Sequence, residues 1–218
     1  MSEKNLWESY NQLLLSDDIS RIEKILSRYE LFKKTINIPG DIVECGVFKG
    51  VSFLFWLKCL KIFSPRASKK VIGFDMFSNF PKKNLNKIEK KSASKYIKSS
   101  KFKGTDIKNL IESSNKIFGP NKYSLIKGNI EKTSKKYIKD NYGFKISLLH
   151  LDLDSYSGTL AALKNFFPHV SKKGIIILDE YSSRGWGETE AVDEFFKDKN
   201  VSIETVPFTH SPTAFIKK

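Results

Sequence analysis

Residues 41–50 read DIVECGVFKG and contain the junction that decides the fold. The run 41–45 follows the breaker Pro39-Gly40, has the length of a short strand, and leads into a loop bounded by two glycines. The next segment, from Val51 to Phe63, has the apolar content and length of a helix. A strand, a glycine-bounded loop and a helix in this order predict one unit of an α/β sheet.

The same alternation repeats along the rest of the chain. Further strands are predicted at 70–75, 123–126, 145–151, 174–178, 201–206 and 213–216, and helices at 107–117, 160–167 and 191–196. Strands that alternate with helices favour an α/β fold with a doubly wound, mostly parallel sheet, here of seven strands. The close spacing of the last two strands predicts an antiparallel C-terminal hairpin.

The length and composition favour a single domain over residues 1–218, since 40% hydrophobic residues, with 17 Phe, can fill one core. An N-terminal helical segment is expected at 1–38, and the polar, lysine-rich segment 82–105 is expected to be a lid insertion. No apolar run approaches the roughly 20 residues of a membrane span, and the N-terminus lacks the layout of a signal peptide. We therefore expect a cytoplasmic protein.

The formal net charge of +14 raises the question of a nucleic-acid partner. Only four of the 38 basic residues are arginine, whereas recognition of phosphate or guanine favours the guanidinium group. The lysines are scattered over most polar positions, which is typical of a solvated surface. Nucleic acid is therefore disfavoured as a partner, and an anionic substrate, partner or membrane surface stays open.

Acidic residues follow four of the predicted strands at the point where each strand ends. Glu44 ends the first strand and Asp75 the second, Asp152 and Asp154 follow the fourth, and Asp179-Glu180 follows the fifth. The carboxyl ends of parallel strands meet at one edge of the sheet, where such folds bind ligands. Carboxylates that converge repel one another, so this edge requires a cation or a hydroxyl-rich ligand.

The glycine loop predicts a ligand that approaches the backbone at a helix N-terminus. It lacks the GxGxxG spacing of dinucleotide-binding loops and has an acid, Glu44, directly before Cys45-Gly46. An acid there suits an amino group, and Asp75 can accept hydrogen bonds from paired ribose hydroxyls. A nucleoside joined to an amino acid meets both requirements, which predicts S-adenosylmethionine, with S-adenosylhomocysteine as product. The alternative is an ordinary tight turn with capping acids.

Five ordered motifs resemble the macrocin O-methyltransferase (TylF-like) family of class I methyltransferases. They are VECGVFKG at 43–50, FDMF at 74–77, HLDLDSY at 150–156, GIIILDEY at 174–181 and AVDEF at 191–195, within a stretch of about residues 40–196. The resemblance implies a Rossmann-like class I methyltransferase fold. It also implies methyl transfer from S-adenosylmethionine to a hydroxyl, commonly of a sugar, with a bound divalent cation, usually Mg²⁺.

The resemblance assigns roles to individual residues. It implies that Asp152, Asp179 and Glu180 hold the metal, that Asp152 is also the general base, and that Asn129 contacts the adenine. A plain Gly-Asn turn is the alternative for the last of these. The complete set of expected cofactor-binding residues is Glu44, Cys45, Gly46, Val47, Phe48, Gly50, Ser52, Asp75, Met76, Asn129 and Ile130.

The chain also departs from the family pattern. Val51 stands where a second glycine is common, Ser78-Asn79 replaces the usual Glu-Gly, and Glu180 replaces the second aspartate of the metal pair. Glutamate can still bind Mg²⁺, but its longer side chain changes the reach. The metal site is therefore less firmly implied than the cofactor site.

Two further side chains are candidates near the reacting groups. His150 precedes Asp152 by two positions and points to the same face of its strand, which makes it an alternative base or a structural histidine. Trp186 lies in the loop after the fifth strand, where it either stacks on a sugar ring or anchors the core.

Three other functions are also compatible with the sequence. Asp152-Leu153-Asp154 is also the acidic motif of many metal-dependent glycosyltransferases, and the positive charge would suit an RNA methyltransferase. A catalytically silent protein that binds S-adenosylmethionine is the third. The expected partner is a small-molecule or glycan acceptor that can be anionic, and the expected assembly is a homo-oligomer, with a dimer left open.

Overall fold

The predicted strand, loop and helix of residues 41–63 are present in the computed structural model, which describes residues 3–78, 85–100 and 105–218. Strand β1 covers Asp41–Cys45 and helix α3 covers Val51–Phe63. Gly50 precedes α3 with φ of 81°, a left-handed conformation that favours glycine. The apolar positions of α3, among them Phe53, Trp56 and Leu57, are completely buried, which fixes this helix on the sheet.

A seven-stranded sheet with the strand order β3-β2-β1-β4-β5-β7-β6 forms the centre of the molecule. Strands β1 to β5 are parallel, whereas β7 runs antiparallel to both β5 and β6. The bounds of the remaining strands are Val71–Asp75 (β2), Tyr123–Lys127 (β3), Ile146–Leu151 (β4), Val170–Leu178 (β5), Ile203–Thr205 (β6) and Ala214–Lys217 (β7). The doubly wound sheet and its C-terminal hairpin are thus confirmed.

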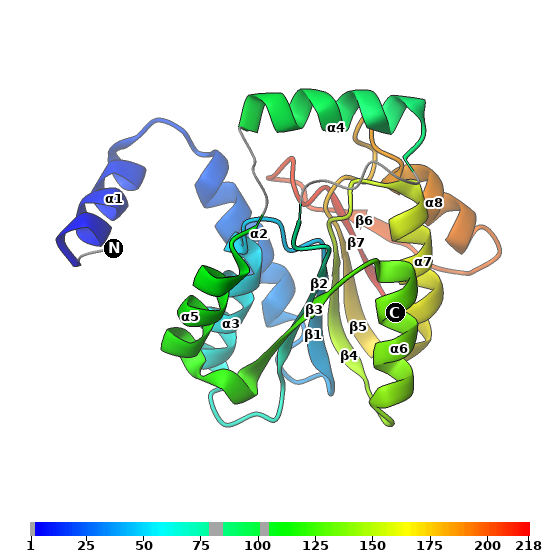
Figure 1. The fold of residues 1–218 in the computed structure, drawn as a ribbon, viewed down its shortest axis with the longest axis horizontal. Coiled ribbons are helices and arrows are strands. Elements are labelled where there is room, and N and C mark those ends of the chain that lie inside the picture. Colours follow the sequence, from blue (N-terminus) through cyan, green and yellow to red (C-terminus); the bar gives the residue numbers. More distant parts are fainter. Residues whose placement is uncertain (1–2, 79–84, 101–104) are drawn as a thin grey trace.

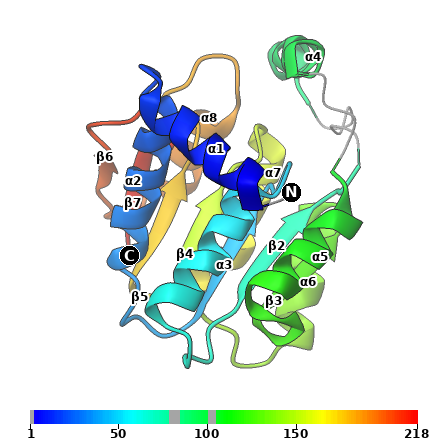
Figure 2. The same cartoon turned by 90° about the vertical axis from the view of Figure 1, so that its left-hand side faces the viewer.

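Helices cover both faces of the sheet (Figures 1 and 2). On one face α2 (Ser20–Lys33), α3 and α5 (Ile107–Phe118) pack around Phe32, Trp56 and Leu148. On the other face α6 (Ile130–Asp140), α7 (Tyr156–Phe166) and α8 (Glu188–Phe196) pack around Phe74 and Phe166. Two short 3-10 turns, Pro120–Lys122 and Phe167–His169, complete the elements.

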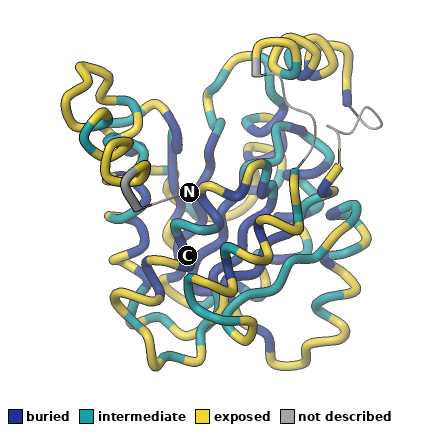
Figure 3. Tube along the Cα trace, turned by 60° about the vertical axis from the view of Figure 1, so that its left-hand side comes forward, coloured by how far each residue is buried: buried dark blue, intermediate teal, exposed yellow. Residues whose placement is uncertain are grey.

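Two helices lie outside these layers. Helix α1 (Glu3–Leu15) extends away from the body, and α4 (Lys87–Ser100) lies above the carboxyl ends of the strands (Figure 1). Both are largely exposed, in contrast to the strands (Figure 3). None of the helices in the described ranges has both the length and the apolar character needed to cross a membrane.

The structure differs from the sequence predictions mainly at polar segments. The predicted N-terminal helical segment is two helices, and the start of α2 is held by Asp18, whose Oδ1 accepts a hydrogen bond from Ser20 N at 2.8 Å. Helix α6 was not predicted, because only Ile130 and Ser134 of its residues are buried. Within the expected lid 82–105, residues 87–100 form α4, while 82–84 and 101–104 lie outside the described residues.

Candidate active site at the carboxyl ends of the strands

A cavity of about 750 Å³ lies at the carboxyl ends of β1 and β4. The chain leaves β1 toward β2 on one side, and β4 lies on the other, so this is the switch point at which such sheets bind ligands. The loops after β1 to β5 all line the cavity, and α2 and α4 add further walls. The acids predicted to gather at one edge of the sheet therefore surround a space that can hold a ligand.

Gly46 allows two loops to touch at the floor of this cavity. Its φ is 92°, and a Cβ atom at this position would lie 1.7 Å from the carbonyl oxygen of Asp152. The backbone of the two loops is also joined directly, because Asp152 N donates a hydrogen bond to Cys45 O at 2.9 Å. Glycine is therefore required here for the backbone contact itself.

Asp75 at the end of β2 organises the glycine loop. Its Oδ2 accepts hydrogen bonds from Val47 N at 2.8 Å and Phe48 N at 3.0 Å, and its Oδ1 accepts one from Phe77 N at 2.7 Å. The sequence reasoning assigned Asp75 only to ribose hydroxyls and missed this structural role. Asp75 lines the cavity, and each carboxylate oxygen has two lone pairs, so Oδ1 retains the capacity to accept a ligand hydroxyl.

Asn129 and Ile130 lie where β3 passes into α6. Asn129 caps this helix, since its Oδ1 accepts a hydrogen bond from Glu131 N at 2.8 Å, and Gly128 N donates to Asp75 O at 2.9 Å. The alternative for Asn129 was a plain Gly-Asn turn, and the structure gives Asn129 a structural role as the cap of α6. Both Asn129 and Ile130 also line the cavity, so the adenine contact stays a prediction.

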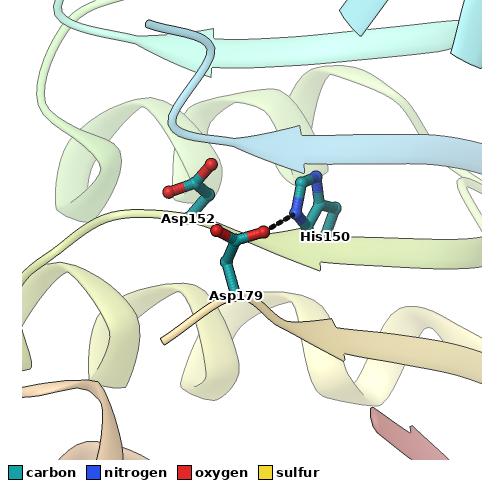
Figure 4. Close-up of side chains that lie close together, drawn as sticks. All are labelled: His150, Asp152 and Asp179. Carbon is teal, nitrogen blue, oxygen red and sulfur yellow. Dashed lines mark hydrogen bonds and ion pairs between the residues drawn. The ribbon is translucent and has the colours of Figure 1, made fainter. Parts of the chain in front are cut away.

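A buried chain of three side chains runs beneath the cavity. His150 is completely buried, with Nδ1 3.1 Å from Glu44 Oε1 and Nε2 3.2 Å from Asp179 Oδ1 (Figure 4 shows the second contact). Glu44 and His150 are register neighbours on β1 and β4, which brings them together. Burial would lower the pKa of His150, but hydrogen bonds and charges of Asp179 and Glu44 raise it to about 9. His150 is therefore an imidazolium at neutral pH and holds its protons between two carboxylates.

Asp152 and Asp179 are neighbouring carboxyls with opposite properties. Removal from water raises the pKa of Asp152 well above its usual range, and the charges of Asp179 and Asp154 raise it further. Burial would also raise the pKa of Asp179, but the hydrogen bond and charge of His150, with Arg28 and Ser211, hold it well below its usual range. Asp179 is therefore ionised, and Asp152 has a high proton affinity.

Asp154 and Glu180 line the same part of the cavity. Strand β4 ends at Leu151, and Asp154 has φ of 52°, so Asp154 reaches the cavity from a turn and not from the strand. Burial and the charges of Glu180 and Asp179 raise the pKa of Asp154 to about 7. Burial likewise raises the pKa of Glu180, which a hydrogen bond involving Ser183 partly offsets.

The carboxyls of Asp152 and Asp179 fit a hard cation. Their oxygens and one His150 nitrogen lie within 4.8 Å of one another, the one group of this kind in the described part of the chain (Figure 4). Mg²⁺ prefers carboxylate oxygens, and a cation would relieve the repulsion that raises the pKa of Asp152. His150 already faces two carboxylates, which makes it a poor ligand. Glu180 is not a member of the group.

The structure thus brings most of the predicted site residues together. Those that line the cavity are Gly46, Val47, Phe48, Ser52, Asp75, Met76, Asn129, Ile130, Asp152, Asp179, Glu180 and Trp186. Glu44, Cys45, Gly50 and His150 are not among the lining residues. Glu44 and Cys45 are completely buried within β1, between β2 and β4, and Glu44 Oε1 contacts His150, while the expected contact of Glu44 with a ligand amino group stays a prediction.

Several residues of the site were not found by sequence reasoning. Ser211 Oγ donates a hydrogen bond to Asp179 Oδ2 at 2.6 Å, although 32 positions separate them and no local pattern marks the contact. Arg21, Lys24 and Arg28 of α2 line the cavity, and their spacing within a helix was the signal that could have identified them. Tyr96 of α4 lines it as well.

Most of the chain matches one known protein family. A model of the family described as Macrocin-O-methyltransferase (TylF) matches residues 20–211. The Mycinamicin III 3''-O-methyltransferase of Micromonospora griseorubida is 25% identical over 173 residues, which cover 78% of this chain. The chain spans 65% of the length of that relative.

Solved structures show the same fold. The calicheamicin methyltransferase CalS11 superposes with a TM-score of 0.78 at 23% identity, covering 99% of this chain and 86% of CalS11. The O-methyltransferase NovP superposes with a TM-score of 0.75 at 20% identity, covering 90% of this chain and 80% of NovP. The predicted Rossmann-like class I methyltransferase fold is confirmed.

Proposed function

Because the chain belongs to the macrocin O-methyltransferase (TylF) family, we propose that it transfers a methyl group from S-adenosylmethionine to a hydroxyl of a sugar or glycosylated small molecule. Such an acceptor would belong to a surface polysaccharide or a secondary metabolite. The relative from Micromonospora griseorubida is named for a 3''-O-methylation of mycinamicin III, and CalS11 is described as a TDP-rhamnose 3'-O-methyltransferase. Both names support a sugar hydroxyl as acceptor.

One observation carries the proposal: a single cavity holds a glycine loop tied to Asp75 together with the carboxyls of Asp152 and Asp179. Backbone at Gly46 allows a ligand to approach closely, and Asp75 and Asn129 offer acceptors for ribose and base. S-adenosylmethionine, when bound, supplies a methyl group on a sulfonium, which is a good leaving group. The chain then has to align the acceptor hydroxyl and remove its proton.

Asp152 is the proposed general base. A carboxyl with a raised pKa accepts a proton more readily than an ordinary carboxylate, and Asp152 faces the cavity. Asp152 and Asp179 would hold Mg²⁺, with Glu180 as the third ligand implied by the family resemblance. The metal, when bound, would lower the pKa of the acceptor hydroxyl.

In this scheme His150 positions Asp179 and does not act as the base. Both of its ring nitrogens face carboxylates, and it is completely buried, so an acceptor hydroxyl cannot reach it. The imidazolium keeps Asp179 ionised and oriented toward Asp152. We therefore assign Asp152 to proton transfer and His150 to positioning.

Calorimetric titration with S-adenosylmethionine, with and without Mg²⁺, tests the proposal. We expect S-adenosylmethionine to bind in both conditions and Mg²⁺ to increase methyl transfer to a sugar acceptor. A metal-dependent glycosyltransferase would instead bind a sugar nucleotide with the metal and fail to bind S-adenosylmethionine, and that result would overturn the proposal. An RNA methyltransferase would bind RNA with a steep dependence on salt.

A further inference from the structure

Three cations of α2 lie along one stripe of the helix and line the cavity. Arg21, Lys24 and Arg28 follow one another at spacings of three and four residues, which places their side chains on one face. Figure 2 shows α2 and α4 on opposite sides of the molecule, with the carboxyl ends of the strands between them. The first turns of α2 therefore present positive charge to the cavity from the side opposite α4.

Arginine is rare in this chain, and this makes its use here informative. The sequence has 38 basic residues but only four arginines, and two of them, Arg21 and Arg28, line the cavity. Elsewhere in the sequence lysine supplies almost all of the positive charge. The guanidinium group binds the oxygens of phosphate or carboxylate through paired N–H donors, which lysine cannot do.

Arg28 is buried and only partly satisfied. It is 9% exposed, its Nη2 lies 3.8 Å from Asp179 Oδ1, and its Nε has no hydrogen-bond partner among the described residues. An unsatisfied buried donor destabilises a protein, so such a group requires a reason to be kept. An oxygen of a ligand in the cavity would supply the missing acceptor.

Arg21 and Lys24 make no salt bridge within 4.0 Å to any residue in the ranges that the structure describes. Both side chains line the cavity and are therefore available to a ligand.

We propose that Arg21, Lys24 and Arg28 bind the diphosphate of an acceptor that is a nucleoside diphosphate sugar. This inference rests on the proposed function, because it assigns the acceptor of the same site. From Arg21 to Arg28 the helix rises about 10 Å, and Arg21 and Lys24 are one turn apart. Two phosphoryl groups in a row match two cations one turn apart, whereas a single carboxylate would be satisfied by one arginine.

The carboxyls on the floor of the cavity do not conflict with an anionic acceptor. Asp179 Oδ1 lies 3.2 Å from His150 Nε2 and 3.8 Å from Arg28 Nη2, so cationic groups already offset its charge. The diphosphate would lie toward the start of α2, and the sugar hydroxyl would lie toward Asp152. Trp186 also lines the cavity and provides an aromatic surface for the sugar or the base.

Calorimetry on the protein saturated with S-adenosylhomocysteine tests the proposal. The probes are uridine diphosphate, thymidine diphosphate, inorganic pyrophosphate and glucuronate. We expect at least one nucleoside diphosphate and pyrophosphate to bind, and the double variant Arg21→Gln with Lys24→Gln to weaken this binding more than tenfold and to reduce its salt dependence. Lys33→Gln, which removes an exposed charge at the other end of α2, is the matched control and should change binding less than twofold.

The outcomes separate this inference from the proposed function. Binding of S-adenosylhomocysteine without binding of diphosphates overturns the inference alone, and so does equal weakening in the control variant or binding of glucuronate only. Binding of diphosphates without S-adenosylhomocysteine overturns the methyl transfer and supports the cation site. Unchanged affinity of the double variant for S-adenosylhomocysteine shows that it is folded and excludes a role of these cations in binding the carboxylate of the cofactor.

Discussion

At the scale of single residues, the site depends on two neighbouring carboxyls with opposite proton affinities. Asp179 is surrounded by His150, Arg28 and Ser211, which favour its ionised form, while Asp152 is desolvated beside other acids. Pairs of acids whose surroundings move their pKa values apart are typical of sites that need one fixed charge and one proton acceptor. This contrast supports Asp152 as base and Asp179 as permanent anion.

Asp152→Asn is expected to abolish methyl transfer while leaving cofactor binding intact. Asparagine keeps the shape of the side chain but cannot accept the proton, so kcat should fall by roughly 10²–10⁴. Affinity for S-adenosylhomocysteine, measured by calorimetry, should change less than about threefold, the smaller effect expected of a group outside the cofactor contacts. Asp140→Asn on the exposed end of α6 is the control. Normal turnover in the Asp152 variant would remove Asp152 from both roles.

Gly46→Ala is expected to destabilise the protein strongly, because its Cβ would lie 1.7 Å from Asp152 O. Gly143→Ala is a matched control: its φ is 81°, close to the 92° of Gly46, but no atom lies within 4 Å of its added Cβ. Both variants carry the cost of a left-handed residue, roughly 1–2 kcal/mol, and Gly46→Ala adds about 1–3 kcal/mol of overlap. Urea unfolding measures the difference. An equal loss of stability in the two variants would contradict the close contact between the loops at Gly46 and Asp152.

Sequence reasoning identified the acids of the site but not their partners. Strand ends and the glycine loop are local patterns, so Asp75, Asp152 and Asp179 could be placed at one edge of the sheet. The contact of Glu44 with His150 depends on which strands are neighbours, and the contact of Ser211 with Asp179 depends on how the last hairpin returns to β5. Such contacts follow from topology, which the sequence pattern left unspecified.

At the scale of elements, α4 is anchored over the site by one buried acid. Glu89 is 1% exposed, and its Oε1 accepts a hydrogen bond from Tyr156 N, the first residue of α7, at 2.7 Å. Its Oε2 accepts another from Asn86 N at 2.7 Å. A carboxylate at a helix N-terminus is favoured by the helix dipole. The expected role of this segment as a lid stays a prediction. The two hydrogen bonds of Glu89 give this prediction a physical basis.

Glu89→Gln should loosen α4 without unfolding the body. The amide keeps the size of the side chain but loses the negative charge, which should cost roughly 1–2 kcal/mol of local stability. Backbone amides of α4 should then exchange hydrogen about tenfold faster, as that free energy implies, while those of β1 and β4 stay protected. Glu112→Gln on the exposed face of α5 is the control. Uniformly faster exchange over the whole chain would instead indicate global destabilisation.

The elements that were predicted and those that were missed differ in apolar content. Strands β1, β2 and β4 are almost completely buried, so their apolar runs identified them. Helices α4 and α6 lie mostly in solvent and consist largely of lysine and other polar residues. Such helices depend on caps, as at Asn129, and on a few contacts such as that of Glu89, which hydrophobic periodicity does not report.

At the scale of the whole molecule, α1 leaves apolar side chains in solvent. Leu6, Trp7 and Leu14 are 62%, 65% and 54% exposed on a helix that extends from the body. The segment also carries acids, Glu8 and Asp17-Asp18, while the whole chain has a net charge of +14. Exposed apolar side chains and local acids give the expected homo-oligomer a physical basis, and it stays a prediction.

Light scattering tests this expectation directly. The protein should have a mass above the 25.0 kDa of one chain, and Trp7→Lys with Leu14→Lys should return it to that mass. Ile88→Lys, which changes an equally exposed apolar residue on α4, should leave the assembly unchanged. A monomeric parent protein would contradict the expectation.

Stability of the whole molecule should depend on pH through the same buried groups. The folded pKa of His150 is raised to about 9, so its contribution is fully present below about pH 6.5 and is lost as the pH rises through 9. The folded pKa of Asp154 is raised to about 7, so the free energy of unfolding also decreases as the pH rises from about 4 to 7. The pKa of Asp179 is lowered, and its contribution is lost only when the pH falls below about 4.

Replacement of His150 should therefore remove most of the loss of stability above neutral pH. In the absence of metal and cofactor, the free energy of unfolding of the parent protein should contain a His150 contribution that decreases by roughly 3 kcal/mol from pH 6.5 to pH 9. Lys69, whose pKa burial lowers to about 8, acts in the opposite direction, but it is present in both proteins and cancels in the comparison. Urea unfolding of the parent and of His150→Gln at pH 6.5, 7.5 and 9 gives the difference. Parallel curves would show that the imidazole between Glu44 and Asp179 is neutral, and Asp179 would then owe its ionised state to Arg28 and Ser211 alone.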